Sequence, residues 1–294
     1  MRVIVNPSAG KGAGRRCLSE LRSALSQIWP GHYLVQTGAS GEAESLARES
    51  ALQGDPMLIS VGGDGTVSEV VNGLAGSSTA LGIVAVGTGN DVARTLGLPL
   101  KRPLAALDVI RQGARKKIDL GWDGSRYFVS ILGIGFPAVV AAEASRQRHF
   151  AGPLAFGFSV YRRITEMTAA RAVIKVDKDT RELECTSILV QNTPFTGGGL
   201  RMVPDAKVDD GWLDVVTVDN IGRINLLWNF PKLYRGTHLA NSHFKVLRCR
   251  RLGVQTEPSL AMTLDGEPYG LSPIEISVAP AAVTVLVKQG TCEL

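Results

Sequence analysis

The stretch VGGDGTVSEVVNGL, residues 61–74, places three glycines around Asp64 directly after an apolar run. Glycine allows positive φ angles and a close backbone approach, so backbone N–H groups and a helix N-terminus can converge on phosphate oxygens at such a turn. A single turn of this kind can also be purely structural, because glycine-rich turns commonly join strands to helices. The stretch therefore predicts a phosphate-binding turn, and the support for this prediction depends on the rest of the chain.

The first half of the chain contains two more glycine-rich turns, NPSAGKG at residues 6–12 and GTGND at residues 87–91. Each follows a predicted strand. Strands predicted at residues 3–6, 33–37, 57–61 and 81–86 alternate with helices predicted at residues 18–28, 40–53, 67–74 and 104–112. This alternation is typical of a parallel sheet covered by helices, which binds ligands at the carboxyl ends of its strands. We therefore expect the three turns to gather at one edge of the sheet.

The turns do not match the common nucleotide-binding motifs. The run Gly10-Lys11-Gly12 cannot complete the pattern G-x-x-x-x-G-K-[ST], and no G-x-G-x-x-G follows a predicted strand. The carboxylate of Asp64 could instead meet a nucleotide hydroxyl or a metal ion, while Thr66 and Thr88 offer hydroxyl groups beside the phosphates. The sequence thus favours a kinase of another lineage.

Beyond residue 120 the chain is rich in strand patterns such as AVIKVDK, CTSILVQN, LDVVTVD and IEISV. Two helices are predicted in this half, at residues 153–167 and 225–234, and the apolar stretch at residues 127–142 is interpreted as buried strand and turn. We therefore predict an α/β nucleotide-binding domain over residues 1–120. A mainly antiparallel β domain should follow over residues 121–294, and its last strand can return to the first domain.

Composition and targeting signals narrow the class of protein. Apolar residues make up 45% of the chain and charged residues 20%, which is typical of a globular protein and excludes intrinsic disorder. Cys17, Cys185, Cys249 and Cys292 form no C-x-x-C pair, so we expect reduced, structural thiols. The N-terminus lacks the shape of a signal peptide, and residues 127–142 are shorter than the ~20 residues of a spanning helix. We expect a cytoplasmic protein.

The net charge of +5 comes with small basic clusters at residues 115–117, 146–148, 162–163 and 248–251. Most such clusters are simply solvated faces. No aromatic residues interleave with them as nucleic-acid stacking would favour, so we expect no nucleic-acid partner. Anionic lipid head groups suit the clusters better, which predicts peripheral contact with an anionic membrane surface.

The motifs of both halves together resemble those of the diacylglycerol kinase catalytic family, in particular its bacterial soluble lipid kinases. The resemblance rests on NPSAGKG, on GGDGTVSEVVNGL, on GTGNDVARTLGLP, on QNTPFTGGGLRMVPDAKVDDGWLDVV at residues 191–216, and on LDGEP at residues 264–268. It therefore covers nearly the whole chain. It implies an α/β N-terminal domain with a parallel sheet like that of phosphofructokinase and NAD kinase, then a β-sandwich domain, with nucleotide bound between them.

The resemblance also implies which residues bind ATP and magnesium (Mg²⁺). The metal would lie at the A-x-x-x-D-G turn, held mostly by backbone carbonyls and one carboxylate, which falls on Lys207, Asp210 and Trp212; such oxygen ligands suit a hard cation. Without the resemblance, this turn is better explained as a plain connection between strands. The implied nucleotide contacts are Asn6, Pro7, Ser8, Ala9, Gly10, Thr37, Gly62, Gly63, Asp64, Gly65, Thr66, Val67, Ser68 and Thr88.

The motif LDGEP allows two interpretations. Asp-Gly between alternating apolar segments is the strongest short hairpin signal, so the motif could be a plain turn. Alternatively, Asp265 and Glu267 present carboxylates, one of which accepts the proton of an attacking hydroxyl during phosphoryl transfer. The resemblance favours Glu267 as the base, with Asp265 orienting it or assisting a metal, but spacing alone leaves the two roles exchangeable.

The phosphate acceptor stays open at this point. Residues 131–140 and the helix at residues 154–167 are candidates for lining a lipid pocket, with Arg162 and Arg163 meeting head groups. Diacylglycerol, phosphatidylglycerol, a sphingoid lipid or an unusual bacterial lipid would all fit.

Two other classes compete with a lipid kinase: an NAD-kinase-like enzyme with a soluble hydroxyl substrate, and a nucleotide-binding module without catalysis. The first is disfavoured because the β half lacks a second glycine/serine/threonine cluster for a dinucleotide. The second is disfavoured because Asp64, Asp210, Asp265 and Glu267 are all present.

Overall fold

The computed structural model describes residues 1–146 and 153–290, and the chain divides into two units. Unit 1 contains Met1–Ile118 together with the C-terminal stretch that begins at Ala281, and unit 2 contains Asp119–Pro280. Two strands, β5 (Ala114–Trp122) and β17 (Ile274–Val287), begin in one unit and end in the other. Arg148 and Cys292, which the sequence analysis considered, lie outside the described residues.

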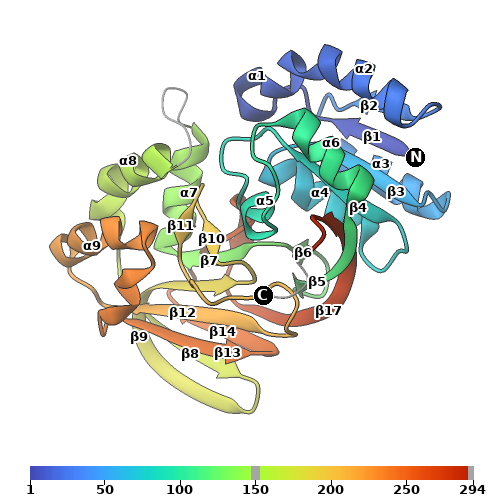
Figure 1. Ribbon diagram of the computed structural model, residues 1–294. Helices are drawn as coiled ribbons and strands as arrows, with labels where there is room; N and C mark the ends of the chain where they lie inside the picture. The colour runs from blue at the N-terminus through green and yellow to red at the C-terminus, as the bar shows by residue number, and fades with distance from the viewer. Residues whose placement is uncertain (147–152, 291–294) are drawn as a thin grey trace. The chain divides into compact units, whose positions relative to one another are not determined.

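Unit 1 is built on a parallel sheet with the strand order β17-β4-β3-β1-β2 (Figure 1). Its central strands are buried runs of valine, isoleucine and leucine, as expected where helices cover both faces of a parallel sheet. Besides β17, the strands of this sheet are β1 (Arg2–Val5), β2 (Tyr33–Gln36), β3 (Met57–Gly62) and β4 (Ala80–Ala85).

Amphipathic helices connect these strands. Leu21 and Leu25, one helical turn apart, join Leu107 and Ile110 in a single apolar cluster with the sheet, which fixes two of the helices to it. The helices are α1 (Ala9–Arg16), α2 (Leu18–Ile28), α3 (Glu42–Leu52), α4 (Asp64–Leu74), α5 (Asp91–Thr95) and α6 (Pro103–Gln112). The predicted alternation of strands and helices is confirmed.

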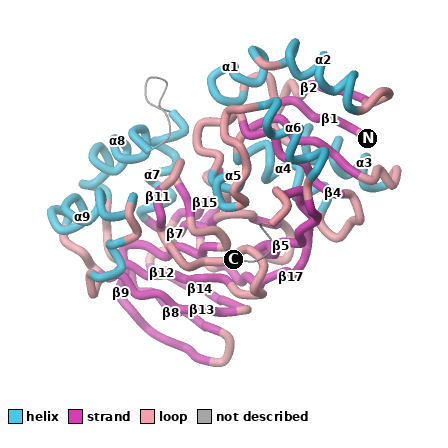
Figure 2. The backbone as a smooth tube through the Cα atoms, viewed as in Figure 1, coloured by secondary structure: helices cyan, strands magenta, loops and turns pink. Residues whose placement is uncertain are grey.

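Unit 2 is mainly antiparallel, as predicted. Figure 2 shows its strands in magenta. Its sheet has the order β16-β15-β7-β9-β8-β14-β17, and β12 pairs with β9 and with β13. The further strands are β6 (Tyr127–Phe128), β7 (Ile131–Gly135), β8 (Ala170–Val176), β9 (Asp179–Gln191), β10 (Phe195–Thr196), β11 (Leu200–Arg201), β12 (Leu213–Asp219), β13 (Phe244–Cys249), β14 (Arg251–Glu257), β15 (Ala261–Leu264) and β16 (Glu267–Leu271).

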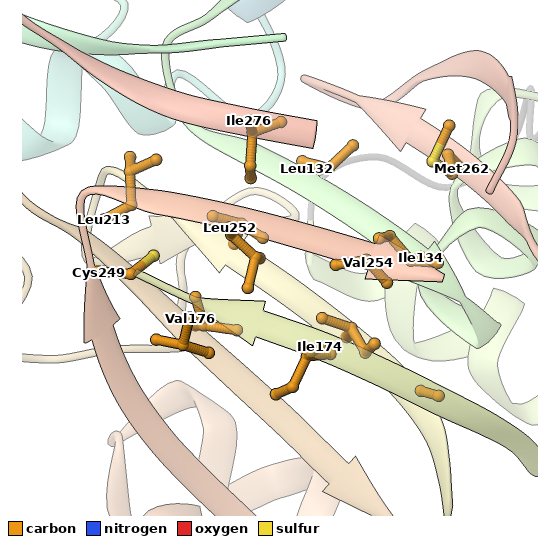
Figure 3. Close-up of a cluster of buried hydrophobic side chains, with 14 of the residues drawn as sticks. Leu132, Ile134, Ile174, Val176, Leu213, Cys249, Leu252, Val254, Met262 and Ile276 are labelled. Carbon is orange, nitrogen blue, oxygen red and sulfur yellow. The ribbon is translucent and has the colours of Figure 1, made fainter. Parts of the chain in front are cut away.

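Successive residues of β9 and β12 belong to two different cores, because side chains alternate across a strand. Leu213 of β12 belongs to the core drawn in Figure 3, together with Ile134, Leu252 and Cys249. Val216, also on β12, belongs to a second core that includes residues of the helices. Burial raises the pKa of the Cys249 thiol to about 12, in keeping with a structural cysteine.

Helices supply the other side of the second core, and one of them corrects the sequence analysis. Residues 127–142 were predicted as buried strand and turn, but a helix, α7 (Phe136–Arg146), begins directly after β7. Pro137 stands in its first turn, where the missing N–H has no helical partner to lose. The other helical elements are α8 (Pro153–Arg163), η1 (Ile164–Glu166), α9 (Arg223–Asn229), η2 (Phe230–Tyr234) and η3 (Thr237–Ala240).

Within residues 1–146 and 153–290, none of the helices combines the length and the apolar character that a transmembrane segment requires.

Candidate active site

The three glycine-rich turns meet at the carboxyl ends of β1, β3 and β4. A Cβ atom on Gly10 would lie 2.0 Å from the carbonyl oxygen of Val86, and one on Gly87 would lie 2.4 Å from the Cα atom of Gly63. Such distances leave room for hydrogen only, so glycine is required at both positions. The turns therefore pack backbone against backbone, as expected from the sheet topology.

Asn6 fastens the first turn to the second. Its Nδ2 donates to Oγ1 of Thr66 over 3.0 Å, and its Oδ1 accepts from the backbone N–H of Ser8 over 3.0 Å. Its own N–H donates to the carbonyl of Val61 over 2.9 Å, which extends the β1–β3 ladder by one bond. The Asn6 side chain thus shapes the turn between β1 and α1, whose residues Pro7, Ser8, Ala9 and Gly10 were predicted to contact nucleotide.

Asp64 joins the second turn to the third. It stands in the first turn of α4, and its Oδ1 accepts from the backbone N–H of Val92 in α5 over 3.2 Å. Thr88, in the third turn, is exposed, as are Ser8 and Gly65. These groups are the ones that a phosphate could reach directly.

Other predicted nucleotide residues are buried. Val67 is 3% exposed, and its N–H donates to the carbonyl of Gly63 over 3.0 Å within α4, so this residue supports the turn rather than offering a group to a ligand. Ser68 and Thr37 are buried as well; the Thr37 N–H continues the β1–β2 ladder to Val5 over 2.9 Å. Gly62 ends β3.

The predicted metal turn in unit 2 places Asp210 beside the guanidinium of Arg248. Oδ2 of Asp210 accepts from Arg248, and Oδ1 accepts from the N–H of Trp212 over 3.1 Å. The guanidinium of Arg248 also lies 3.4 Å from Asp214, whose pKa is raised to about 6, mainly because the carboxyl is buried. Arg250 lies over the Trp212 ring, 4.6 Å from its centroid.

The donor set of this turn suits a hard cation. A carboxylate has about four lone-pair sites, so the bonds from Arg248 and Trp212 leave acceptor capacity on Asp210, and the carbonyl oxygens of Lys207 and Trp212 are of the type that magnesium accepts. Within the described residues, no three His, Cys, Asp or Glu side chains form a metal cluster, but the predicted set needs only one carboxylate.

Asp119 was missed by the sequence analysis and holds this turn in place. Its side chain is buried, and its Oδ2 accepts from the N–H of Gly211 over 2.6 Å. Its backbone N–H donates to the carbonyl of Val208 over 2.6 Å. A lone carboxylate inside the apolar stretch IDLGW was the signal that could have identified it.

Asp265 forms the hairpin turn and also holds a neighbouring strand. Asp265 and Gly266 both have positive φ, 48° and 91°, as in the two-residue turns that join antiparallel strands. The carboxylate accepts three backbone N–H groups: from Val129 over 2.9 Å, from Ser130 over 2.8 Å and from Ile131 over 3.1 Å. LDGEP is thus a hairpin turn, and the carboxylate of its Asp265 is also hydrogen-bonded to residues 129–131.

Glu267 has a different environment. It is exposed and begins β16, where its carbonyl accepts from the Thr263 hydroxyl over 3.0 Å. The backbone of Glu267 is thereby fixed, while its carboxylate extends into solvent. Of the two acidic residues, Glu267 is the more exposed.

Buried amides lie beside this hairpin. Gln191 pairs with Ile131 in the β7–β9 ladder, and neither polar atom of its side chain has a hydrogen-bond partner within the described residues. Asn192 donates to the carbonyls of Asp119 and Val129, over 2.9 and 2.8 Å, and so connects the metal turn to the segment that Asp265 holds. These two residues open the motif QNTPF, whose polar role the sequence analysis did not assign.

Comparison with known proteins identifies the family. Residues 1–122 match the diacylglycerol kinase catalytic domain, and residues 130–287 match the YegS C-terminal NAD kinase beta sandwich-like domain. A diacylglycerol kinase of Mycobacterium tuberculosis (strain H37Rv) is 30% identical over 290 residues, which cover 96% of this chain and 93% of the relative. The chain belongs to the diacylglycerol kinase family.

Other relatives of the kinase agree. A diacylglycerol kinase of Bacillus subtilis (strain 168) is 29% identical over 277 residues, covering 93% of this chain and 91% of the relative. A crystal structure of a diacylglycerol kinase from Bacillus anthracis (strain Sterne) has a TM-score of 0.77 at 23% identity, covering 99% and 97% of the two chains. The predicted fold class and the predicted phosphotransferase class are confirmed, and family membership implies nucleotide-dependent phosphoryl transfer.

Unit 2 of the kinase contains an apolar pocket of about 60 Å³, the volume of about two water molecules in the liquid. Residues from both predicted linings contribute to it, and all of its lining residues except Thr186 and Ser187 are apolar. They are Phe136, Pro137, Val140, Phe156, Val160, Thr186, Ser187, Leu189, Met202, Val218, Leu226, Phe230, Leu233 and Phe244.

Arg162 and Arg163, predicted to meet head groups, are both ion-paired. Glu143 of α7 is 5% exposed and lies 3.1 Å from Arg162 and 3.0 Å from Arg163. Arg163 also pairs with Glu166. The two arginines therefore connect α8 to α7, and their charges are balanced by two carboxylates.

Proposed function

We propose that this kinase transfers the γ-phosphate of ATP to the hydroxyl of a membrane lipid, with diacylglycerol as the first candidate. The observation that carries the proposal is the apolar pocket of unit 2, because an acyl chain needs an apolar binding site and a soluble sugar or dinucleotide does not. The relatives are named diacylglycerol kinases, which supports diacylglycerol over a sphingoid lipid or phosphatidylglycerol.

In this proposal the nucleotide phosphates lie against the joined turns of unit 1. Backbone N–H groups and the N-terminus of α4 would stabilise their negative charge, and the exposed hydroxyls of Ser8 and Thr88 would donate to phosphate oxygens. Asp64 would keep the second and third turns in register through its bond to Val92.

Glu267 is proposed as the general base and Asp265 as a positioning residue. An exposed carboxylate on a fixed strand can accept the proton of the acceptor hydroxyl as it attacks phosphorus. The Asp265 carboxylate accepts hydrogen bonds from three backbone N–H groups. Its proposed role is therefore to hold the hairpin, which carries Glu267, in place beside β7.

Magnesium is proposed at Asp210 with the carbonyls of Lys207 and Trp212, in a turn that Asp119 fixes through Gly211. A divalent cation bound there would supply positive charge to a phosphate ligand. The Asp119 carboxylate would orient the backbone of the turn, and the N–H of Trp212 would orient the Asp210 carboxylate toward the cation.

The test is incubation with γ-labelled ATP, magnesium and a total lipid extract, followed by separation of the organic and aqueous phases. We expect label in a lipid with the wild type and none with Glu267→Gln. Chemical identification of the labelled lipid then identifies the acceptor. Label only in an aqueous product would instead indicate an NAD-kinase-like enzyme. No transfer at all, with nucleotide still bound, would indicate a binding module.

A further inference from the structure

The segment Arg223–Tyr234, which forms α9 and η2, presents apolar side chains on two opposite faces. Leu226, Phe230 and Leu233 line the apolar pocket. Ile224 and Trp228, one helical turn apart, point the other way and are 74% and 76% exposed. A helix that only covered a core would carry polar side chains on its outer face, so the outer face of α9 calls for another partner.

The neighbouring helix α8 repeats this arrangement (Figure 1). Its Phe156 stacks on Phe230 of η2, with 6.5 Å between ring centroids, and both rings line the pocket. Tyr161 of α8 does not line the pocket and is 66% exposed. Two adjoining helices thus share an apolar pocket beneath them and expose aromatic or aliphatic side chains away from it.

The charge of the α9 segment indicates which partner it meets. Residues 221–241 contain Arg223, Lys232 and Arg235 and no aspartate or glutamate. Arg223 donates to the carbonyl of Thr165 and Lys232 to the amide of Asn229, both neutral groups, so these bonds leave the positive charge uncompensated. This differs from Arg162 and Arg163, whose charges the carboxylates of Glu143 and Glu166 balance.

We infer that the segment Arg223–Tyr234 docks this kinase on an anionic bilayer. Ile224, Trp228 and the partly exposed Leu227 enter the boundary between head groups and acyl chains, where amphipathic helices and tryptophan are favoured. The three cations contact lipid phosphates. The inner face of the same segment then receives an acyl chain of the acceptor, a step that rests on the proposed lipid-kinase function.

Docking also explains how so small a pocket can serve a lipid. Its free space has the volume of only about two water molecules, so an acyl chain enters only if lining side chains such as Phe230 and Phe156 separate. Insertion of the outer face into the bilayer can supply the free energy for that separation. The inserted residues and the lining residues alternate on one short segment, so a movement of the segment affects both.

The first test measures binding to vesicles without nucleotide or acceptor. Large vesicles of equimolar phosphatidylcholine and phosphatidylglycerol are sedimented with the wild type, with Ile224→Ser/Trp228→Ser, and with Leu52→Ser as a control that removes an 84% exposed leucine from unit 1. We expect the double variant to bind at least about tenfold more weakly and the control to match the wild type. Equal binding of all three would overturn the proposal.

The second test asks whether Trp228 itself enters the bilayer. Vesicles whose lipids are brominated along the acyl chains should quench part of the tryptophan fluorescence of the wild type. They should quench none in Trp228→Phe, which keeps an aromatic ring at this position. Quenching that is unchanged by Trp228→Phe would assign insertion to a different surface and refute the assignment of α9.

The third test concerns charge. Arg235→Gln should weaken vesicle binding about fivefold at an ionic strength of about 0.1 M and have little effect at about 1 M, where the Debye length falls to about 3 Å. Binding that is equally tight to vesicles of phosphatidylcholine alone would remove the anionic surface from the proposal.

Activity assays separate this inference from the proposed function. With a short-chain diacylglycerol dispersed as monomers, Ile224→Ser/Trp228→Ser should retain kcat/KM, while its activity on vesicles falls with its binding. Loss of both activities in a folded double variant would mean that α9 acts in catalysis rather than in docking. If the wild type phosphorylates no lipid, the proposed function fails, but vesicle binding still decides whether α9 docks.

Discussion

Replacing Asp265 with asparagine tests whether this carboxylate holds the hairpin or acts as the base. The carboxylate accepts three backbone N–H groups from residues 129–131. An amide keeps one acceptor oxygen, which can serve Ser130 and Ile131, but it turns an NH₂ group toward the N–H of Val129. Asp265→Asn should therefore loosen the junction between the β15–β16 hairpin and the start of β7.

The magnitude follows from the number of bonds. A hydrogen bond to a charged group contributes about 1.5–3 kcal/mol, and one such bond is lost. The other two become neutral, and each weakens by about 1 kcal/mol. Because the Asp265 side chain is only half-buried, water recovers part of the loss, and we expect about 2–4 kcal/mol in total. For a unit of this size that corresponds to a fall in Tm of roughly 4–16 °C.

Glu267→Gln is the matched variant, because it removes an exposed carboxylate two positions away. We expect its stability to stay within about 0.5 kcal/mol of the wild type, since the side chain has no structural role. Its turnover should fall by about 10²- to 10⁴-fold if it is the base. Asp265→Asn should lose both stability and turnover, because a displaced hairpin also misplaces Glu267.

Thermal unfolding followed by circular dichroism, hydrogen exchange of the amides at residues 129–131, and initial rates with saturating ATP distinguish these outcomes. Faster exchange at Val129 in Asp265→Asn alone is the local signature of the lost bond. If Asp265→Asn unfolds at the same temperature as the wild type but loses turnover, the carboxylate acts on substrate and does not hold the hairpin.

Three further outcomes follow from other carboxylates and one histidine. Asp64→Ala should weaken ATP binding, measured by calorimetry, because its bond to Val92 joins two of the glycine-rich turns; unchanged affinity would remove Asp64 from the nucleotide site. Glu143→Gln should lower the free energy of unfolding by about 1–2 kcal/mol in urea titrations, since two half-exposed arginines lose their shared partner, and an equally stable variant would contradict the α7–α8 connection. Burial lowers the pKa of His238 to about 4, below its unfolded value near 6.5, so its neutral form is stabilised in the folded state. Its contribution is therefore present above about pH 6.5 and is lost as the pH falls toward about 4; relative to His238→Gln, the wild type should lose about 2 kcal/mol between about pH 7 and pH 5, and a difference independent of pH would refute the burial argument.

The α/β half could be predicted because its signals are local. The strands are short apolar runs, three of them are followed by glycine-rich turns, and the sequence contains the periodicities that separate strands from helices. Parallel topology then follows from alternation, and it brings the carboxyl ends of β1, β3 and β4 to one edge with no further information. The prediction failed locally at residues 136–142, where an apolar run next to Pro137 was interpreted as strand and turn. An apolar run of this length is compatible with either a buried strand or a buried helix.

The acidic sites show the limit more clearly. LDGEP fixed the hairpin turn, because positive φ at Asp265 and Gly266 is a local requirement. It could not assign the roles of Asp265 and Glu267, which depend on backbone N–H groups more than a hundred residues earlier in the chain. Asp119 was missed for the same reason, since its partner Gly211 is distant in sequence.

The sequence by itself determined the class of fold, the phosphate-binding turns, and the motifs that mark a diacylglycerol kinase, because these depend on residue type and on spacing within one element. Only the tertiary structure decided that Asp265 is bound to β7, that Arg162 and Arg163 are paired with Glu143, and that α9 has an apolar face on each side. The physical reason is that hydrogen bonds, ion pairs and burial are properties of pairs of residues, and folding alone determines which distant residues form those pairs.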